Sequence, residues 1–315
     1  MPGLATLRGS ARNAERIEDV VMTDSSVALL PDRGIVEVEG DDVVDFLQSL
    51  LTNDVERAAP GESMFAGLLT PQGKILFDFL IYSPAPNRFW LDCPAEFAGD
   101  VARRLNLYRL RSKVAVADRS AEMAVGVPQG AVERVSPAAL ASFADPRHPD
   151  LPRRYILPPA AASGSTQDRA VGLNAYHAAR LALCVPEGGR DYLYGEAFPH
   201  EVCYDLLNGV DFEKGCYVGQ EVVSRMHHRG VAKTRIAGVR GSAALPAIGS
   251  EITGGEYPVG HLGSSQGVLG IALIRLDRAD DAARHRIPLR SGDVMLTLRR
   301  PSWANYEVPA AEAAA

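Results

Sequence analysis

From Ser26 onward, short runs of apolar residues separated by polar ones predict strands before any helix. Residues 27–30 and 35–38 have this pattern, and Pro31-Asp32-Arg33-Gly34 between them has the composition of a hairpin turn. Residues 43–51 then carry apolar side chains at helical spacing behind Gly40-Asp41-Asp42, which predicts a helix. The same reasoning predicts strands over 65–69, 75–82 and 88–92 and a helix that ends near residue 110.

The pattern changes twice in the second half of the chain. Residues 131–165 are rich in Pro, Ala and Ser and indicate loops around a second α/β unit, while 173–183 and 201–207 predict helices. After Lys233, short strands punctuated by Gly and Pro are typical of a small all-β barrel or sandwich. We therefore predict an α+β protein with domains over 26–118, 119–231 and 232–308, between a disordered extension over 1–25 and a disordered tail over 309–315.

Composition excludes several classes of protein. With 46% hydrophobic and 23% charged residues, the 315-residue chain is globular and long enough for two or three domains. A net charge of −6 argues against direct nucleic-acid binding, and no apolar run approaches the roughly 20 residues that span a bilayer. The first 22 residues mix Arg with Glu and Asp around no apolar core, so they are not a secretory signal, and Met22 is an alternative start.

The four cysteines, at 93, 184, 203 and 216, have no C-x-x-C spacing. This scatter fits neither a zinc site nor a disulfide framework, so we expect no resident metal and a cytoplasmic location. Cys216 stands between Gly215 and Gly219, and a helix is predicted from Gln220 to about His227. A nearby helix start and Lys214 favour the thiolate form of this cysteine. The alternative is a small buried residue in a tight turn.

No Asp or Glu occurs between Val222 and Ser250, although Arg and Lys recur there. Such a positive segment suits a carboxylate-rich or phosphate-bearing partner. The alternative is a solvated face whose charges pair with acids elsewhere in the fold. Adjacent His227 and His228 point to different sides of a helix, which makes them a poor chelating pair.

Lys214-Gly215-Cys216-Tyr217-Val218-Gly219-Gln220-Glu221 resembles the K-G-C-Y-x-G-Q-E signature of the YgfZ family at every position. Residues 46–54 and 69–78 resemble that family's first helix and its strand–turn–strand unit, and the likeness extends from about 26 to 308. It implies a three-domain fold like the glycine-cleavage T-protein, around a central opening that binds tetrahydrofolate or a one-carbon derivative. Members support assembly or repair of iron–sulfur proteins, including tRNA-methylthiolating enzymes, and mitochondrial counterparts act late in [4Fe–4S] maturation.

The resemblance also implies roles for particular residues. Cys216 would be the functional centre, with a transient cluster contact, and Asp78 a second catalytic candidate. The expected cofactor-binding residues are Lys214, Tyr217, Gln220, Glu221, Arg225 and Arg180. Aromatic walls for a pterin could come from Trp90, Tyr204 and Tyr217.

Two positions depart from the folate enzymes of this fold. Phe77 replaces one acid of the pair that aminomethyl transfer uses, so only Asp78 is left. Ala182, in a run that resembles R-x-E-x-G-x-P, stands where a carboxylate meets the pterin. For Arg180, in the same run, the alternative to a cofactor contact is a structural role as an ion-pair partner.

Three functions follow as hypotheses. The first is a folate-binding factor, with little or no catalysis, that serves iron–sulfur client enzymes or assembly proteins through Cys216. The second is a tetrahydrofolate-dependent aminomethyltransferase or related one-carbon transferase. The third is an interaction module in which Cys216 only packs.

Overall fold

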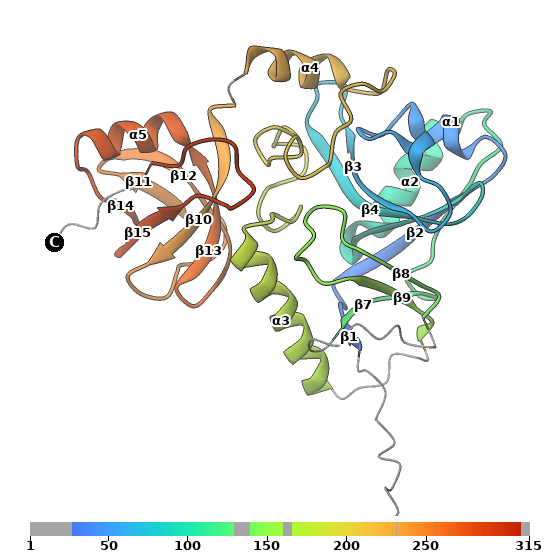
Figure 1. Ribbon diagram of the computed structural model, residues 1–315, viewed down its shortest axis with the longest axis horizontal. Coiled ribbons are helices and arrows are strands. Elements are labelled where there is room, and N and C mark those ends of the chain that lie inside the picture. Colours follow the sequence, from blue (N-terminus) through green and yellow to red (C-terminus); the bar gives the residue numbers. More distant parts are fainter. Residues whose placement is uncertain (1–26, 129–138, 160–165, 231, 310–315) are drawn as a thin grey trace, which may run out of the picture.

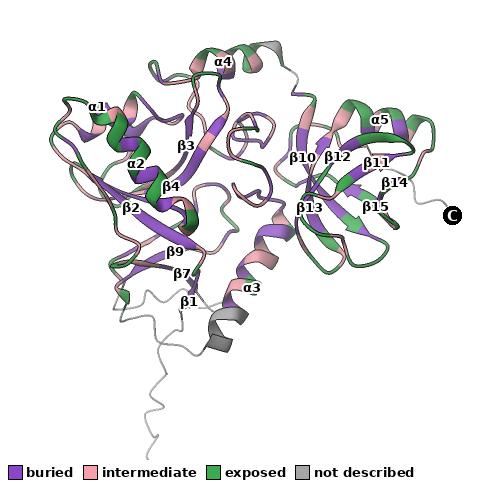
Figure 2. Ribbon diagram, turned by 180° about the vertical axis from the view of Figure 1, so that it is seen from behind, coloured by how far each residue is buried: buried purple, intermediate pink, exposed green. Residues whose placement is uncertain are grey.

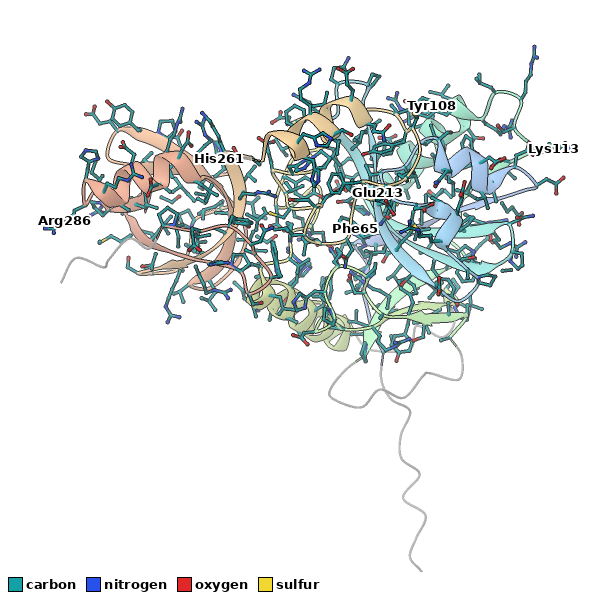
Figure 3. The ribbon with its side chains drawn as sticks, turned by 45° about the horizontal axis from the view of Figure 1, so that its top comes forward. Phe65, Tyr108, Lys113, Glu213, His261 and Arg286 are labelled. Carbon is teal, nitrogen blue, oxygen red and sulfur yellow. The ribbon has the colours of Figure 1, made fainter. Side chains whose placement is uncertain are left out.

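The computed structural model describes residues 27–128, 139–159, 166–230 and 232–309. The predicted extension over 1–25, nearly all of the predicted tail, and much of the Pro-rich segment over 131–165 lie outside these ranges. Within them, no helix has the length and apolar character that crossing a membrane requires. The first sheet and the C-terminal barrel form opposite ends of the molecule, as Lys113 and Arg286 mark in Figure 3.

The first sheet has five antiparallel strands in the order β3-β4-β5-β2-β6. Helices α1 and α2 cover one face, where Val38, Phe79 and Leu91 pack against them. Side chains alternate between the two faces of a strand, so Asp78 points away from these helices, towards the centre of the molecule. The bounds are β2 Arg33–Glu39, α1 Val43–Gln48, η1 Val55–Arg57, β3 Ser63–Leu69, β4 Ile75–Ala85, β5 Arg88–Pro94, η2 Ala95–Phe97, α2 Ala98–Arg109 and β6 Ala115–Asp118.

A second sheet has the order β1-β7-β9-β8. It consists of β1 Val27–Leu29, β7 Ala124–Pro128, β8 Ala141–Phe143 and β9 Arg154–Leu157. The predicted hairpin between 27–30 and 35–38 is wrong, because β1 pairs with β7 whereas β2 pairs with β5 and β6. The turn at Pro31 and Asp32 therefore passes the chain from one sheet to the other. Local composition identified a turn but could not identify the partners of the two strands.

The C-terminal part is a closed barrel of six strands in the order β10-β13-β12-β11-β14-β15, as the sequence predicted. Its apolar interior includes Val239, Ile252 and Leu298. One helix, α5, covers part of its surface, with its exposed side facing solvent (Figure 2). The bounds are β10 Thr234–Gly241, β11 Glu251–Gly254, β12 Tyr257–Gln266, β13 Leu269–Arg275, α5 Leu276–Arg284, β14 Leu289–Ser291 and β15 Val294–Arg299.

Between the sheets and the barrel lie helix α3 (Thr166–Leu183), a turn-rich segment over 184–219, and helix α4 (Gln220–Arg229) that leads into the barrel (Figure 1). The helix predicted from Gln220 is confirmed. The helix predicted over 201–207 is not formed: Cys203 has φ 66°, a left-handed conformation that an α-helix excludes. This stretch folds as consecutive turns, which bring Tyr204 beside the first sheet.

Candidate functional site

Two glycine-containing segments that are far apart in sequence touch each other. One is the turn between β3 and β4, residues 70–74, and the other is the cysteine loop, residues 213–219. Gly219 has φ 82°, and a Cβ there would lie 2.6 Å from the carbonyl oxygen of Thr70. Gly73 has φ 81°, and a Cβ there would lie 2.7 Å from Cβ of Val222. Only glycine permits both the backbone conformation and this approach, so the two glycines dock the start of α4 on the turn.

The cysteine loop exposes its thiol. Cys216 is solvent-exposed, whereas Cys93, Cys184 and Cys203 are buried, and all four lie in the described ranges. Burial raises the pKa of each buried thiol, that of Cys93 to about 12, so these three stay protonated and unreactive at neutral pH. Space around Gly215 is open, because a Cβ added there would meet no atom within 4 Å. A partner could therefore approach Cys216 from this side.

Lys214 anchors the cysteine loop to the first domain. Its ammonium donates to the carbonyl oxygens of Gln48, Leu51 and Asn53 at 2.7–2.9 Å. Burial lowers its pKa to about 8, partly offset by Asp54 and other nearby acids. Because an ammonium has three N–H donors, all are occupied by these carbonyls, and none is left for a hydrogen bond to Cys216. The expected support of the thiolate by Lys214 therefore does not take the form of a direct contact.

The remaining predicted binding residues of this motif point in different directions. Tyr217 is buried, and the Lys214 ammonium lies 5.1 Å from the centre of its ring. Gln220 donates weakly to the carbonyl of Gly215 at 3.4 Å. Glu221 and Arg225 form an ion pair with each other on the exposed side of α4. The motif thus forms an anchor and an exposed surface, and a cofactor role for these side chains stays a prediction.

The basic segment after Val222 is largely neutralised. Arg225 pairs with Glu221, and Arg235 is buried with a two-pronged ion pair to Asp205, at 2.7 and 3.0 Å. Lys233 lies 3.9 Å from Asp277. Lys233 and Arg235 therefore pair with acids elsewhere in the fold, as the alternative interpretation expects for this segment.

Asp78 is buried at the centre of the molecule within a tyrosine cluster formed by Tyr192, Tyr194 and Tyr204. The hydroxyl of Tyr192 donates to one carboxylate oxygen, which also accepts from Tyr204 at 3.2 Å. The other oxygen accepts from Tyr194 at 2.7 Å. Burial, and then the Asp78 charge, raises the pKa of all three phenols far above the ordinary value, so they remain hydrogen-bond donors.

Sequence reasoning named Asp78 and Tyr204 but missed Tyr192 and Tyr194. The Tyr-Leu-Tyr spacing places two phenols on the same side of an extended segment, which was the available signal. Their common target lies 114 and 116 residues away and could not be read from the spacing. Trp90, predicted as a pterin wall, is a core residue whose ring N–H donates to Glu37 at 2.9 Å.

Phe77 occupies the position next to Asp78 where aminomethyl transfer would use a second acid. Its ring packs at the edge of Tyr194, with ring centres 5.7 Å apart, and beside Phe97. This environment is apolar and contains no second carboxylate at that position. Both oxygens of Asp78 already accept hydrogen bonds, so the arrangement fixes a carboxylate more than it prepares a general base.

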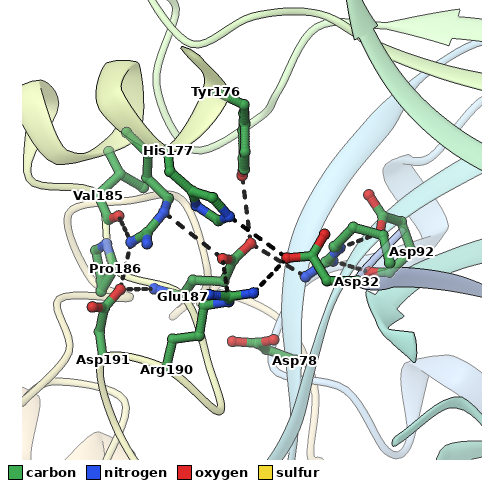
Figure 4. Close-up of polar contacts among 12 residues, drawn as sticks. Asp32, Asp78, Asp92, Tyr176, His177, Val185, Pro186, Glu187, Arg190 and Asp191 are labelled. Carbon is green, nitrogen blue, oxygen red and sulfur yellow. Dashed lines mark hydrogen bonds and ion pairs between the residues drawn. The ribbon is translucent and has the colours of Figure 1, made fainter. Parts of the chain in front are cut away.

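A group of buried ion pairs lies around Arg33, the first residue of β2 (Figure 4). Arg33 contacts Asp92 at 2.6 Å and Glu187 at 3.4 Å. Glu187 is fully enclosed, and although burial raises its pKa, four nearby arginines bring it well below the ordinary value. Its oxygen Oε2 has no hydrogen-bond partner among the residues that the structure describes. The Nε and Nη1 atoms of Arg154 are likewise buried and make no hydrogen bond within that set, and Nε lies 3.9 Å from Asp92. Ion pairs engage Oε2 of Glu187, with Arg180 at 3.7 Å and Arg190 at 3.6 Å.

Arg180 joins the middle of the molecule to the barrel. It pairs with Asp191, donates to the carbonyl of Val185 at 3.0 Å, and donates to the hydroxyl of Ser264 in β12 at 2.9 Å. Asp191 in turn accepts from the backbone N–H of Ser264 at 2.6 Å. The ion-pair role considered for Arg180 is therefore what the structure shows, and a contact with a cofactor stays a prediction.

Asp32, His177 and Glu187 place one potential ligand atom each within 4.8 Å of the others. The guanidinium of Arg190 already lies there, 2.7 Å from Asp32 and 3.6 Å from Glu187. A positive group therefore fills the position that a metal ion would need, and we assign no metal to this group.

Two family models match the chain: the GCVT N-terminal domain over residues 16–134 and the CAF17 C-terminal beta-barrel domain over residues 233–306. The human iron–sulfur cluster assembly factor IBA57, mitochondrial, is 30% identical over 299 residues, which cover 87% of this chain and 84% of the human protein. The mouse protein of the same name is 32% identical over 78% of this chain and 76% of its own length. The chain belongs to the IBA57 family.

A further IBA57 homolog, from Mycosarcoma maydis, is 35% identical over 228 residues, and there the chain spans only 56% of the relative's length. Among solved structures, the glycine cleavage system aminomethyltransferase T from Bartonella henselae aligns with a TM-score of 0.68 over 90% of this chain and 87% of that one. At 16% identity this likeness shows the fold alone. The predicted T-protein-like fold with a C-terminal barrel is thereby confirmed.

The comparisons correct two expectations. The relatives are IBA57 assembly factors, so the wider group predicted from the motif is right but its YgfZ branch is not singled out. A cytoplasmic location is wrong for this family, because the fungal, human and mouse relatives are all named mitochondrial. Unpaired cysteines indicate a reducing compartment and cannot distinguish one reducing compartment from another.

Proposed function

We propose that this IBA57-family chain supports the assembly or repair of iron–sulfur proteins through the thiol of Cys216. The observation that carries the proposal is the exposed cysteine on a loop whose two ends are fixed, by Lys214 at one end and by Gly219 at the other. A fixed loop presents the thiol in one place without occupying it with internal contacts. Clients would include the tRNA-methylthiolating enzymes that YgfZ-type factors serve.

The chemistry needed from Cys216 is modest. As a thiolate it can ligate cluster iron during transfer, while the client or a carrier protein supplies the other ligands. A cluster is cargo in this scheme, so a single protein ligand is sufficient. The open space beside Gly215 leaves room for the partner that brings those ligands.

Tetrahydrofolate is the second part of the proposal. The carboxylate of Glu187, whose Oε2 accepts no hydrogen bond from the described residues, would accept the N–H groups of a pterin edge and so compensate for Ala182. The Nε and Nη1 groups of Arg154, which donate no hydrogen bond within that set, suit the acceptor atoms of the same ring. Bound folate would supply one-carbon chemistry; the protein residues would orient it and exclude water.

Aminomethyl transfer is the less favoured function. Phe77 contributes an apolar ring where an acid is needed, and the Asp78 carboxylate is engaged by the tyrosine cluster on both oxygens. Incubation with tetrahydrofolate and an aminomethyl donor should therefore give no methylenetetrahydrofolate above background. Turnover that Asp78→Asn abolishes would restore the transferase hypothesis.

Complementation tests the main proposal. In cells that lack this protein, the full chain should restore the activity of [4Fe–4S] enzymes, and Cys216→Ser should not, although it remains folded. Cys93→Ser, a change in a buried thiol, should affect stability but not this specific function. Full activity of Cys216→Ser would refute the role of the thiol and favour an interaction module.

Calorimetry tests the folate part separately. Tetrahydrofolate should bind the wild type, and Glu187→Gln should weaken that binding while Cys216→Ser leaves it unchanged. Absence of binding at millimolar ligand limits any interaction to about −4 kcal/mol and would remove folate from the proposal.

A further inference from the structure

A cavity of about 370 Å³ lies between the C-terminal half of α4 and the beginning of the barrel. His200, His227, Arg235, Tyr306 and Glu307 contribute to its lining. None of them belongs to the cysteine loop or to the tyrosine cluster, and the proposed function uses none of them.

His200 is the unusual residue of this cavity. Only 3% of its surface is exposed, and neither ring nitrogen has a hydrogen-bond partner among the described residues. A neutral imidazole has one donor and one acceptor, and burying both without partners is unfavourable. The side chain therefore indicates that something else contacts it.

His227 in α4 is placed to share that ligand. Its ring stacks on Phe212 with centres 3.8 Å apart, and His200 lies 5.8 Å from the Phe212 centre and 6.1 Å from the His227 centre. Because these two distances are nearly equal, His200 lies beside the stacked pair, near the edge of the His227 ring and not above its face. The nitrogens of an imidazole and their lone pairs lie in the plane of its ring, and not above its face.

We propose that this cavity binds a divalent transition-metal ion through one ring nitrogen each of His200 and His227. Metal–imidazole bonds of about 2.0–2.1 Å place the centres of two coordinated rings roughly 5–6.5 Å apart, a range that includes the observed separation. The exposed carboxylate of Glu307 lines the same cavity, where it pairs with Arg300 at 2.8 Å.

The surrounding charges permit such an ion. Arg235 is the cation in the cavity wall, and its two-pronged pair with Asp205 offsets its charge. The thiol of Cys203 is no competitor, because it is buried, its pKa is raised, and it lies 3.3 Å from the Tyr306 hydroxyl. A pair of imidazoles, with water completing the coordination, suits zinc, iron, cobalt or nickel.

A metal ion at this site would affect the cysteine loop. His200 precedes the cysteine loop in sequence, and His227 follows it within α4. An ion bound to both would cross-link the two flanks of the loop and restrict the position of α4. This inference concerns the chelating pair alone and does not depend on the role of Cys216.

Titration of the chelator-treated full chain with Zn²⁺, and with Co²⁺ followed by its visible spectrum, tests the site. We expect one ion per chain, with affinity weakened at least about tenfold in His227→Gln and in His200→Asn. His261→Gln, a change on the outer surface of the barrel (Figure 3), and Cys216→Ser should bind as the wild type does.

The proposed site would be refuted by the absence of saturable binding or by loss of binding in Cys216→Ser. It would also be refuted if binding depended on His227 and His228 but not on His200, because the ring centres of His227 and His228 are also 5.8 Å apart. If His200→Asn fails to fold, His227→Gln still decides, because His227 is exposed and its replacement leaves the core intact.

Discussion

Gly219→Ala should undock α4 from the turn over 70–74. A left-handed conformation costs a non-glycine residue about 1–2 kcal/mol. The added Cβ would also lie 2.6 Å from the Thr70 carbonyl oxygen and 3.1 Å from Cα of Gly73, and backbone atoms cannot move aside cheaply. Overpacking of this kind costs about 1–3 kcal/mol. We therefore expect a loss of about 2–5 kcal/mol in the free energy of unfolding.

Two matched glycines separate these contributions. Gly230 has φ 72° with no atom within 4 Å of its Cβ position, so Gly230→Ala should lose only about 1–2 kcal/mol. Gly215 also has open space and no positive φ, and Gly215→Ala should change stability by no more than about 0.5 kcal/mol. Urea unfolding of the three variants measures the series. If Gly219→Ala is no less stable than Gly230→Ala, the close contact with the turn does not exist.

Three more predictions concern individual side chains. Alkylation of the native protein should modify Cys216 rapidly and leave Cys93 unmodified until unfolding, as mass spectrometry of digested peptides would show. Tyr192→Phe removes a donor to a buried carboxylate and should destabilise the fold by about 1.5–3 kcal/mol in urea unfolding; an unchanged midpoint would contradict the hydrogen bond. The pKa of Lys214 lies at about 8 in the folded state against 10.5 ordinarily, so the unfolded chain binds more protons between these values. Stability should then rise with pH across that window relative to Lys214→Met, and equal slopes for both proteins would exclude the shift.

The sequence predicted those parts of the fold that depend on local pattern. Short Gly-punctuated strands after Lys233 indicated an all-β domain, a barrel or a sandwich, and Gly219 followed by Gln220 indicated the start of α4. The helix predicted over 201–207 failed because Cys203 adopts a left-handed conformation, which tertiary contacts impose. The predicted pairing of residues 27–30 with 35–38 was wrong because the composition of a turn does not specify which strands become neighbours in a sheet.

In the candidate site, too, the sequence predicted some features and others depend on the three-dimensional fold. The motif predicted Cys216 as the functional residue, and the structure leaves its side chain exposed. The destination of the Lys214 ammonium, on carbonyls more than 160 residues earlier, could not be inferred from adjacency. Proximity in sequence suggested an electrostatic partner for the thiol, whereas the three-dimensional fold uses the lysine to attach the loop.

The pairing of β1 with β7 affects the order in which the chain can fold during synthesis. Val27 pairs with Pro128, so the first strand must wait for about 100 further residues, roughly 5–20 s of translation at 5–20 residues per second. The first sheet needs no residue beyond β6 and could form in that interval, with the β1 segment unpaired beside it. A nascent chain stalled before residue 124 would therefore expose an apolar strand, and a fragment begun after residue 30 would leave an edge of β7 open to other chains.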